Sequence, residues 1–401
     1  MHSKRIRLIF LLPRCYKPHK PNFATKYELL SDRCTGHIVT ISGQKVRNLP
    51  VASFLFHSEP DSRSFPKRNF RRFWIQALYP LYRLYKKENI DAVIAYDPYS
   101  SAFSAIILKC ALRTKMILEV NGDYHKRDES ISLVKRLIMK MMFEVAVRFA
   151  DAVKVLNCEQ EIYLRRLFPR KQIYRFPNFV ATEYFGSLNA FKGDYLLSVG
   201  HPFHLKGMDI LIRAFKRLCN RFPKARLKIM GYCPNPELQW YKELAGNDPR
   251  IEFVPPGWIE EVGEQVRGCL ALVNAARSEA MGRIHVEAMA CKKPIVASRT
   301  SGALECVEDG RTGLLCEVGD DVDLAEKLEQ FLSDADLATR MGRAGLERMR
   351  KIFSQEKYVS SFMAMVEEVV ATQGARLAGH NDGSRQDCSV GKESIATSKT
   401  V

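Results

Sequence analysis

The sequence predicts an α/β protein with two doubly wound domains, each built on a parallel sheet covered by helices. Apolar runs of strand length alternate with helical stretches in both halves of the 401-residue chain. Such alternation is typical of parallel sheets wrapped by helices. The aperiodic stretch at 178–194 separates the halves and is interpreted as a linker. The chain length fits two or three domains with full cores.

The first half is expected to begin with a buried strand and to continue in alternation. The expected strands are 7–12, 37–42, 91–96, 114–120 and 152–156, and the expected helices are 71–87, 102–111 and 133–149. The opening residues MHSKRIRLIFLLPRC place basic residues before an apolar run, as a signal peptide does. The run is short and lacks a small-residue cleavage site, so we interpret it as the first strand.

The second half repeats the pattern more regularly. The expected strands are 195–199, 226–230, 251–254, 271–274, 294–297 and 313–316, and the helices between them include 207–222, 284–291 and 321–333. We therefore place an N-terminal domain at 1–188 and a C-terminal domain at 189–353. A last helix at 354–372 is expected to cross back to the N-terminal domain. The polar, aperiodic tail at 373–401 is expected to be disordered.

Composition excludes several classes of protein. Hydrophobic residues make up 46% and charged residues 27% of the chain, as in soluble globular proteins. No apolar run reaches the length of a bilayer span. The eleven cysteines are scattered and form no C-x-x-C pair, which argues against a disulfide framework and a zinc site. A reduced, cytoplasmic protein is the expectation.

The net charge of +17 lies wholly in the first half. Residues 1–188 hold 33 Lys and Arg against 16 Asp and Glu, whereas residues 189–401 hold 29 of each. Two stretches, 66–87 and 134–149, mix basic and apolar residues. Such a half should meet an anionic partner: a phospholipid surface, a phosphorylated acceptor or nucleic acid. We expect no nucleic acid, because no basic stripe carries regularly spaced stacking aromatics.

The stretch SEAMGRIHVEAM at 278–289 places two glutamates around a glycine. Glu279 should lie on the loop after a strand, Gly282 should let the backbone approach a ligand, and Glu287 should lie one turn into the next helix. A helix N-terminus after a parallel strand favours phosphate. Carboxylates on either side of a bound diphosphate can accept hydrogen bonds from hydroxyl groups, which describes a nucleotide sugar. The spacing alone also fits two solvated glutamates.

Two flanking motifs favour the ligand-binding interpretation. In SVGHPFHLKGMDILIRAF, a turn at Gly200 follows a strand and Lys206 precedes a helix, where its charge opposes the helix dipole unless an anion is bound. In SGALECVEDGRTGLL, the loop at Gly302 follows a strand end and could also approach phosphate, although its glycines could simply form turns.

Together these motifs resemble the retaining glycosyltransferases of family 4, which have the GT-B architecture of two Rossmann-like domains facing a central cleft. The matched pieces are VGHPFHLKGMDILIRAF, LKIMGYCP, FVPPGW, SEAMGRIHVEAMACKKPIVAS and SGALECVEDGRTGLL, in the family's order over about 190–335. The stretch FADAVKVLNCEQEIYLRRLFPRKQIYRFPNFVATEYF resembles the family's segment before the linker.

The resemblance implies catalytic roles for Glu279 and Lys206. Glu279 should contact the transferred sugar, Lys206 the diphosphate and Glu287 the ribose hydroxyls. The implied donor-binding residues are Gly200, His201, Lys206, Met281, Gly282, Arg283 and Glu287. His201 stands where the family usually has an arginine, so the diphosphate contact is either weaker or helped by Arg283 or His204.

On the acceptor side, the stretch ILEVNGDYHKR aligns Asn121 with a histidine that family members often carry, with Asp123 and His125 close by. Each could orient the acceptor or be a surface loop residue. No general base is evident, and the resemblance implies that the leaving diphosphate oxygen takes this part. It also implies that no cofactor and no divalent metal are required, and no D-x-D motif follows a strand.

The predicted function is retaining transfer of a sugar from a nucleotide-sugar donor to a hydroxyl of a lipid-linked or cell-surface polysaccharide acceptor. The enzyme is expected to lie peripherally on the inner face of an anionic membrane. A catalytically weak or inactive binding protein on the same scaffold is the alternative, and His201 is the feature that favours it.

Overall fold

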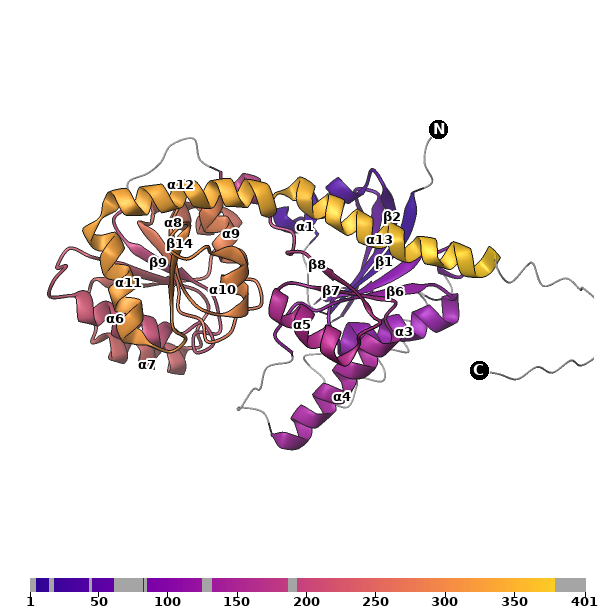
Figure 1. The fold of residues 1–401 in the computed structure, drawn as a ribbon, viewed down its shortest axis with the longest axis horizontal. Coiled ribbons are helices and arrows are strands. Elements are labelled where there is room, and N and C mark those ends of the chain that lie inside the picture. Colours follow the sequence, from indigo (N-terminus) through magenta and orange to yellow (C-terminus); the bar gives the residue numbers. More distant parts are fainter. Residues whose placement is uncertain are drawn as a thin grey trace, which may run out of the picture.

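The computed structural model shows two α/β domains, each built on one sheet, as the sequence predicts (Figure 1). It describes residues 5–13, 18–42, 45–60, 82, 85–124, 132–186 and 193–378. The predicted helix at 71–87 lies almost entirely outside these ranges, and so do the predicted boundary at 188/189 and the tail beyond 378.

The N-terminal sheet has eight strands in the order β3-β4-β2-β1-β5-β6-β7-β8. The strands are β1 (Ile6–Leu12), β2 (Cys34–Ser42), β3 (Val46–Val51), β4 (Phe54–Pro60), β5 (Ala92–Ala95), β6 (Lys115–Glu119), β7 (Ala152–Val155) and β8 (Gln172–Arg175). All five predicted strands are present. The expectation of a wholly parallel sheet is wrong at one edge, where β3 pairs antiparallel with β4. Only two residues, Ala52 and Ser53, join these strands, and so short a connection permits only a hairpin.

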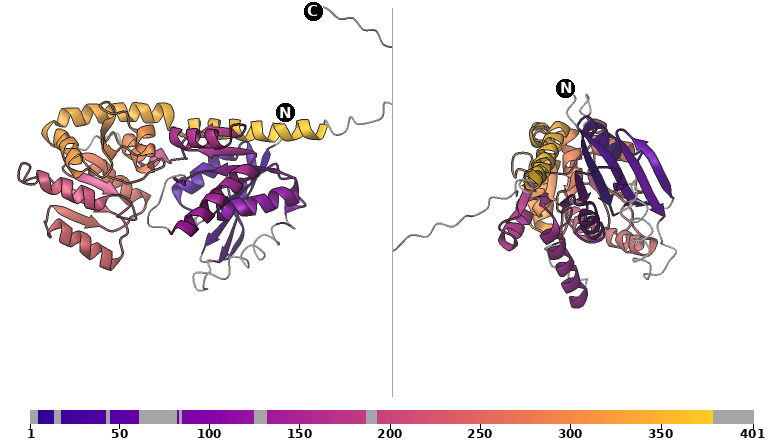
Figure 2. Two further views of the ribbon diagram at one scale, coloured as in Figure 1. Left: turned by 60° about the horizontal axis from the view of Figure 1, so that its bottom comes forward. Right: turned by 90° about the vertical axis from the view of Figure 1, so that its right-hand side faces the viewer.

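Helices cover both faces of this sheet. They are α1 (Pro21–Leu30), α3 (Ser100–Leu112), α4 (Leu133–Phe149) and α5 (Cys158–Leu167). Within the described residues, the buried side chains of α4 are Phe143, Ala146 and Val147, and all three lie in its C-terminal half. Its N-terminal half projects away from the sheet (Figures 1 and 2).

The last helix, α13 (Gln355–Ala378), lies over the N-terminal sheet, whereas α12 (Ala335–Ile352) covers the C-terminal domain (Figure 1). Phe362 of α13 is fully buried and its ring stacks on Phe10 of β1 at 6.0 Å. The helix continues to Ala378, so the predicted disorder is wrong for 373–378. Most residues of that stretch, QGARLA, are strong helix formers, and the single glycine costs only about 1 kcal/mol.

The C-terminal sheet has six parallel strands in the order β11-β10-β9-β12-β13-β14. They are β9 (Leu196–Val199), β10 (Leu227–Met230), β11 (Ile251–Val254), β12 (Ala271–Asn274), β13 (Ile295–Ser298) and β14 (Gly313–Cys316). All six predicted strands are confirmed to within one residue. This is the strand order of a Rossmann fold.

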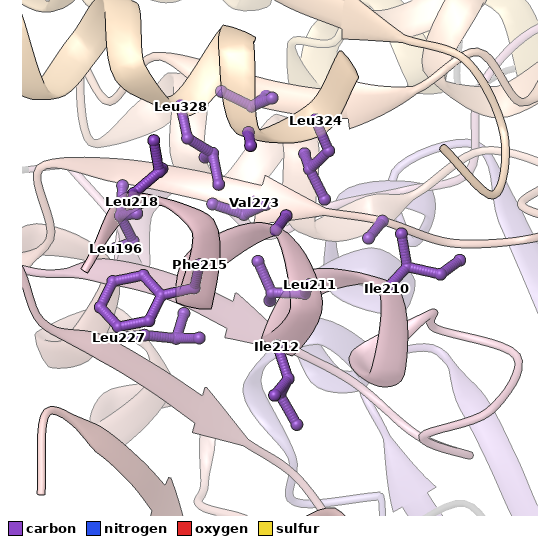
Figure 3. Close-up of a cluster of buried hydrophobic side chains, with 14 of the residues drawn as sticks. Leu196, Ile210, Leu211, Ile212, Phe215, Leu218, Leu227, Val273, Leu324 and Leu328 are labelled. Carbon is purple, nitrogen blue, oxygen red and sulfur yellow. The ribbon is translucent and has the colours of Figure 1, made fainter. Parts of the chain in front are cut away.

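The helices of this domain follow the apolar pattern of the sequence. They are α6 (Met208–Leu218), α7 (Asn235–Ala245), α8 (Ile259–Gly268), α9 (Arg283–Ala290), α10 (Ser301–Cys306), α11 (Asp321–Ser333) and α12. Leu211, Phe215 and Leu218 of α6 pack against the sheet and against Leu324 and Leu328 of α11 (Figure 3). Each such fully buried side chain contributes roughly 1.5–3 kcal/mol relative to exposure.

The strand order of the C-terminal sheet reverses between β9 and β12. From β9 the chain moves outward to β10 and β11, and from β12 it moves the other way to β13 and β14. Open α/β sheets bind their ligands outside the carboxyl ends of strands at such a reversal. The loops after β9 and β12, which carry Lys206 and Glu279, therefore mark the expected ligand position.

Candidate active site

Lys206 and Glu279 meet at the reversal of strand order. Lys206 comes from the loop between β9 and α6, and Glu279 from the loop between β12 and α9. The Lys206 ammonium donates a hydrogen bond to Oε2 of Glu279. Their side chains are only 18% and 16% exposed. The structure thus brings the two predicted catalytic residues together as a largely enclosed ion pair.

The electrostatics of this pair favour an ionised Glu279. Burial opposes ionisation of the carboxyl group. The nearby Lys206 ammonium with its hydrogen bond, helped by the Asn274 amide, outweighs burial, so the pKa of Glu279 lies below its ordinary value. A negative charge therefore stands beside a cation at the carboxyl ends of β9 and β12.

Two glycines make the approach of Lys206 possible. Gly200 has a φ of +149°, and a Cβ there would come within 3.1 Å of the Lys206 Cε. Gly207, the N-cap of α6, has a φ of +65°, and a Cβ there would lie 1.9 Å from the Ala275 carbonyl oxygen. Both positions therefore favour glycine for their backbone conformation, and Gly207 also requires it for space.

The loop that carries Lys206 is anchored by Arg277. The Arg277 guanidinium donates hydrogen bonds to both carboxylate oxygens of Asp209 at 2.8 Å and to the His204 carbonyl oxygen at 2.6 Å. Burial of Asp209 opposes its ionisation, but hydrogen bonds from Arg277 and Arg213 lower its pKa to about 2. His201, on the same loop, is exposed.

Helix α9 begins at Gly282, which has a φ of +70° and carries no side chain that would cover the first turn. Glu287 lies one turn inside the helix, is 5% exposed and forms an ion pair with Arg283 at 3.1 Å. Burial raises the pKa of Glu287, and the Arg283 charge only partly opposes this. Glu287 is thus a buried hydrogen-bond acceptor. Its partner Arg283 is 58% exposed, so the arginine side chain has room to leave the ion pair.

The backbone between Glu279 and Gly282 is fixed by its neighbours. The Gly302 amide donates to the Glu279 carbonyl oxygen at 2.7 Å, and a Cβ at Gly302 would lie 2.5 Å from the Met281 nitrogen. Met281 is buried, and its carbonyl oxygen accepts a hydrogen bond from the Cys306 thiol at 3.1 Å. The glycine after β13 therefore packs against this loop rather than forming a separate ligand loop.

Residues of the N-terminal domain reach the same loop. Asp123 accepts a hydrogen bond from the Ser278 hydroxyl at 2.7 Å, and Asn157 donates to the Ala280 carbonyl oxygen at 2.8 Å. Asn121 accepts a hydrogen bond from Asn178 at 3.0 Å. Asp123 thus borders the loop of Glu279, and Asn121 is linked to it through Asn178, whose backbone amide lies 3.2 Å from the Met281 sulfur. His125 lies outside the described residues.

Three site residues were not foreseen from the sequence. Asn157 caps α5 by accepting from the Gln160 amide at 2.9 Å, and an Asn three residues before a Gln was a usable capping signal. Asn274 ends the otherwise apolar strand β12, and His285 lies on the buried face of α9. For Asn274 and His285, the only signal in the sequence was a polar residue within an apolar run.

No group of three His, Cys, Asp or Glu side chains within the described ranges is arranged to hold a metal ion. Independence of a metal remains a prediction. Among the described cysteines, all are free thiols; six are buried, while Cys110 and Cys158 are exposed.

Comparisons with known proteins agree with this geometry. The sequence profile of the family described as Glycosyl transferases group 1 matches residues 181–348. An uncharacterised glycosyltransferase of Methanocaldococcus jannaschii is 27% identical over 369 residues, which cover 90% of this chain and 98% of that protein.

Two solved structures resemble the whole fold. Sucrose-phosphate synthase from Thermosynechococcus elongatus gives a TM-score of 0.77 at 18% identity and covers 92% of this chain and 100% of its own. HepE from Anabaena in complex with UDP and glucose gives 0.69 at 16% identity, with 91% and 100% covered. The likeness in fold over both domains confirms the predicted GT-B architecture.

The anchoring of the Lys206 loop predicts a pH-dependent loss of stability in an Asp209→Asn variant. The difference between the ordinary pKa of 3.8 and about 2 corresponds to roughly 2 kcal/mol, which the ionised carboxylate contributes at neutral pH. Because the folded-state pKa is lowered, this stabilisation is complete above the ordinary pKa and is lost as pH falls from about 4 towards 2.

Urea unfolding followed by tryptophan fluorescence measures this effect. The free energy of unfolding of wild type should exceed that of the variant by about 2 kcal/mol at pH 7, and the gap should close in acid. Glu326→Gln on the exposed face of α11 is the matched control. A gap that is equal at pH 7 and pH 3 would contradict the assignment.

Proposed function

We propose that the chain is a glycosyltransferase of the group 1 type, which transfers a sugar from a nucleotide-sugar donor with retention of the anomeric configuration. The observation that carries this proposal is the enclosed Lys206–Glu279 ion pair at the reversal of strand order. A cation for a diphosphate and an anion for sugar hydroxyls stand side by side where such folds bind ligands.

In the proposed donor complex, the diphosphate lies between Lys206 and the N-terminus of α9. The free amides of the first helical turn and the ammonium both attract phosphate. Arg283, the first residue of α9, exchanges its Glu287 partner for the diphosphate and so takes the part of the arginine that His201 replaces. Glu287 then accepts hydrogen bonds from the two ribose hydroxyls.

The chemical step breaks the bond between the anomeric carbon and the diphosphate oxygen. The acceptor hydroxyl oxygen bonds to the same face of the anomeric carbon, and its proton passes to the departing phosphate oxygen. Nucleoside diphosphate is the leaving group, so stabilisation of its growing negative charge by Lys206 lowers the barrier. In this scheme neither a metal nor a cofactor is required.

UDP-sugars are the first donors to test. The HepE structure, which shares this fold, holds UDP and glucose. Nothing in the short motifs distinguishes uridine from other bases, so GDP- and ADP-sugars are included in the same screen. Release of nucleoside diphosphate by the purified protein is the direct test, and no release with any donor would favour the inactive binding protein.

We also propose that the N-terminal domain rests on an anionic membrane that holds a lipid-linked acceptor. The N-terminal half of α4 exposes a cluster of large apolar side chains: Leu133, Val134, Leu137, Ile138 and Met141. Exposed Lys135 and Lys140 lie among them. A projecting helix with an apolar cluster and basic neighbours suits insertion into a lipid headgroup region.

This membrane contact is peripheral in the proposal. In the described part of the chain, no helix combines the length and apolar character needed to cross a bilayer. The second basic and apolar stretch, 66–87, lies almost entirely outside the described residues. Among the described residues, the exposed apolar and basic side chains of α4 are therefore the observation that supports the proposed membrane contact.

Replacing Lys206 tests the diphosphate contact. Lys206→Ala should lower kcat by the equivalent of roughly 2–4 kcal/mol, as loss of one oxyanion donor does. Lys224→Ala, an exposed lysine of the same domain, is the control and should leave turnover unchanged. Steady-state kinetics with the best donor provide the measurement, and near-normal turnover by the Lys206 variant would remove its assigned role.

Replacing Glu287 tests the ribose contact. Glu287→Ala should weaken binding of free nucleoside diphosphate by about 10- to 100-fold, since hydrogen bonds to a charged group contribute roughly 1.5–3 kcal/mol. Titration calorimetry measures this, with Glu347→Ala on the exposed face of α12 as control. Unchanged affinity in the Glu287 variant would show that the ribose lies elsewhere.

Vesicle sedimentation tests the membrane contact. The protein should pellet with anionic vesicles at low salt and be released at high salt. Lys135→Ala with Lys140→Ala should weaken binding by roughly 2 kcal/mol, because each basic residue contributes about 1 kcal/mol at such a surface.

Leu137→Gln with Met141→Gln should weaken sedimentation as well, whereas Val322→Gln, an exposed apolar residue of α11, should have no effect. Equal binding to neutral and anionic vesicles, or no binding to either, would refute the proposed membrane contact.

A further inference from the structure

Two buried polar side chains beside the ion pair have no role in the scheme above. Asn274 ends β12 and is 6% exposed, and His285 lies in the first turns of α9 and is 0% exposed. The Asn274 Nδ2 and the His285 Nε2 are 2.8 Å apart. A polar pair enclosed in an otherwise apolar region needs a reason, because burial of polar groups is costly.

The surroundings of Asn274 fix the state of both side chains. The Asn274 amide also faces the carboxylate of Glu279 and lowers the pKa of that group, as a donor beside a carboxylate does. An ionised carboxylate only accepts, so the amide must direct its NH₂ group towards Glu279. The same NH₂ group carries a second hydrogen, which points to His285. The His285 Nε2 is therefore an acceptor, and the ring proton lies on Nδ1.

The imidazole of His285 is neutral. Burial lowers the pKa of His285 to about 4, although the Glu279 carboxylate acts in the opposite direction. The ring is therefore uncharged at neutral pH. It adds no second positive charge beside Glu279, which is paired with Lys206.

The other ring nitrogen supports the turn between Met281 and Gly282. A Cβ at Gly282 would lie 2.4 Å from the His285 Nδ1, so the ring packs directly beneath the glycine. The Met281 backbone favours a proton on this ring, as a carbonyl oxygen facing an N–H would. Within the described residues, however, the contact falls short of hydrogen-bond geometry, and Nδ1 is enclosed without a partner.

Asn274 neighbours Glu279 but, unlike Lys206, does not bind the donor in the proposed function. In the proposed function Lys206 binds the diphosphate, which divides its charge between that group and Glu279. Asn274 lies inside the domain, so its amide stays beside the carboxylate when a donor enters. The orientation of Glu279 during the reaction then depends on the amide, and the orientation of the amide depends on the ring.

We propose that Asn274 and His285 are positioning residues, which hold the Glu279 carboxylate and the Met281–Gly282 turn in the geometry that sugar transfer requires. This rests on the proposed function for its activity readout. Neither residue touches the donor, because both are enclosed; each acts through the loop between β12 and α9. Together they form a buried link from the last residue of a strand to the first turn of the next helix.

Kinetics of the Asn274→Leu, His285→Leu and double variants test the pair. Each single change should lower kcat about 100-fold with little change in donor KM, as expected when a reacting group is misplaced by an ångström. The double variant should lose little more than either single variant, because the two side chains act as one unit.

Thr114→Val is the matched control for simple loss of a buried hydrogen bond. Thr114 is 4% exposed and donates to the Ile90 carbonyl oxygen at 2.7 Å in the N-terminal domain. It should lose stability without losing kcat. Losses of kcat in the Asn274 and His285 variants no greater than in this control, or additive losses in the double variant, would overturn the proposal.

A spectroscopic measurement separates this inference from the proposed function. Nitrogen NMR of the imidazole in the donor-free wild-type protein should show a neutral ring with its proton on Nδ1, and Asn274→Leu should change that tautomer. A wild-type protein that releases no nucleoside diphosphate from any donor would refute the proposed function only. A ring protonated on Nε2, or on both nitrogens, would overturn the pair itself and does not require activity or a stable variant.

Discussion

The reversal of strand order between β9 and β12 sends the loops of these strands in opposite directions, and close contacts between α6 and the end of β12 bring them together again. Gly207 lies so near the Ala275 carbonyl oxygen that a Cβ would come within 1.9 Å of it. Any side chain there would push α6 away from the end of β12 and separate Lys206 from Glu279. Since the ion pair lowers the pKa of Glu279, the charge state of the site also depends on this contact.

The loop that carries Glu279 is held in place by residues of both domains. Gly302 holds it from within the C-terminal domain, while Asn157 and Asp123 hold it from the N-terminal domain. Glu305 adds a further link, because it accepts hydrogen bonds from the Cys158 amide at 2.7 Å and from Arg175 at 3.0 Å. The arrangement of the domains therefore fixes the position of the carboxylate as much as the fold of either domain does.

Periodicity predicted the fold well, because strands buried on both faces, such as β12 and β13, are continuous apolar runs. The edge hairpin of β3 and β4 escaped prediction, since residues such as Asn48 and Pro50 do not favour strands. The family resemblance implied that Lys206 and Glu279 bind parts of one ligand, and the structure places the two side chains together. The resemblance did not reveal Asn274 or His285, because a polar residue in an apolar run acquires meaning only when the packing shows which atoms it faces.

The return of α13 to the N-terminal sheet determines the order in which this chain can fold. Phe362, Met365 and Val369 complete the core beneath β1, and they are among the last described residues. While the chain is being synthesised, the N-terminal sheet therefore has one apolar face open until the C-terminal domain has emerged. Domains usually fold in order of synthesis. Here the second domain, whose core clusters hold no residue beyond Phe353, can fold before the first is complete. The nascent first domain is therefore the part that depends on protection from aggregation.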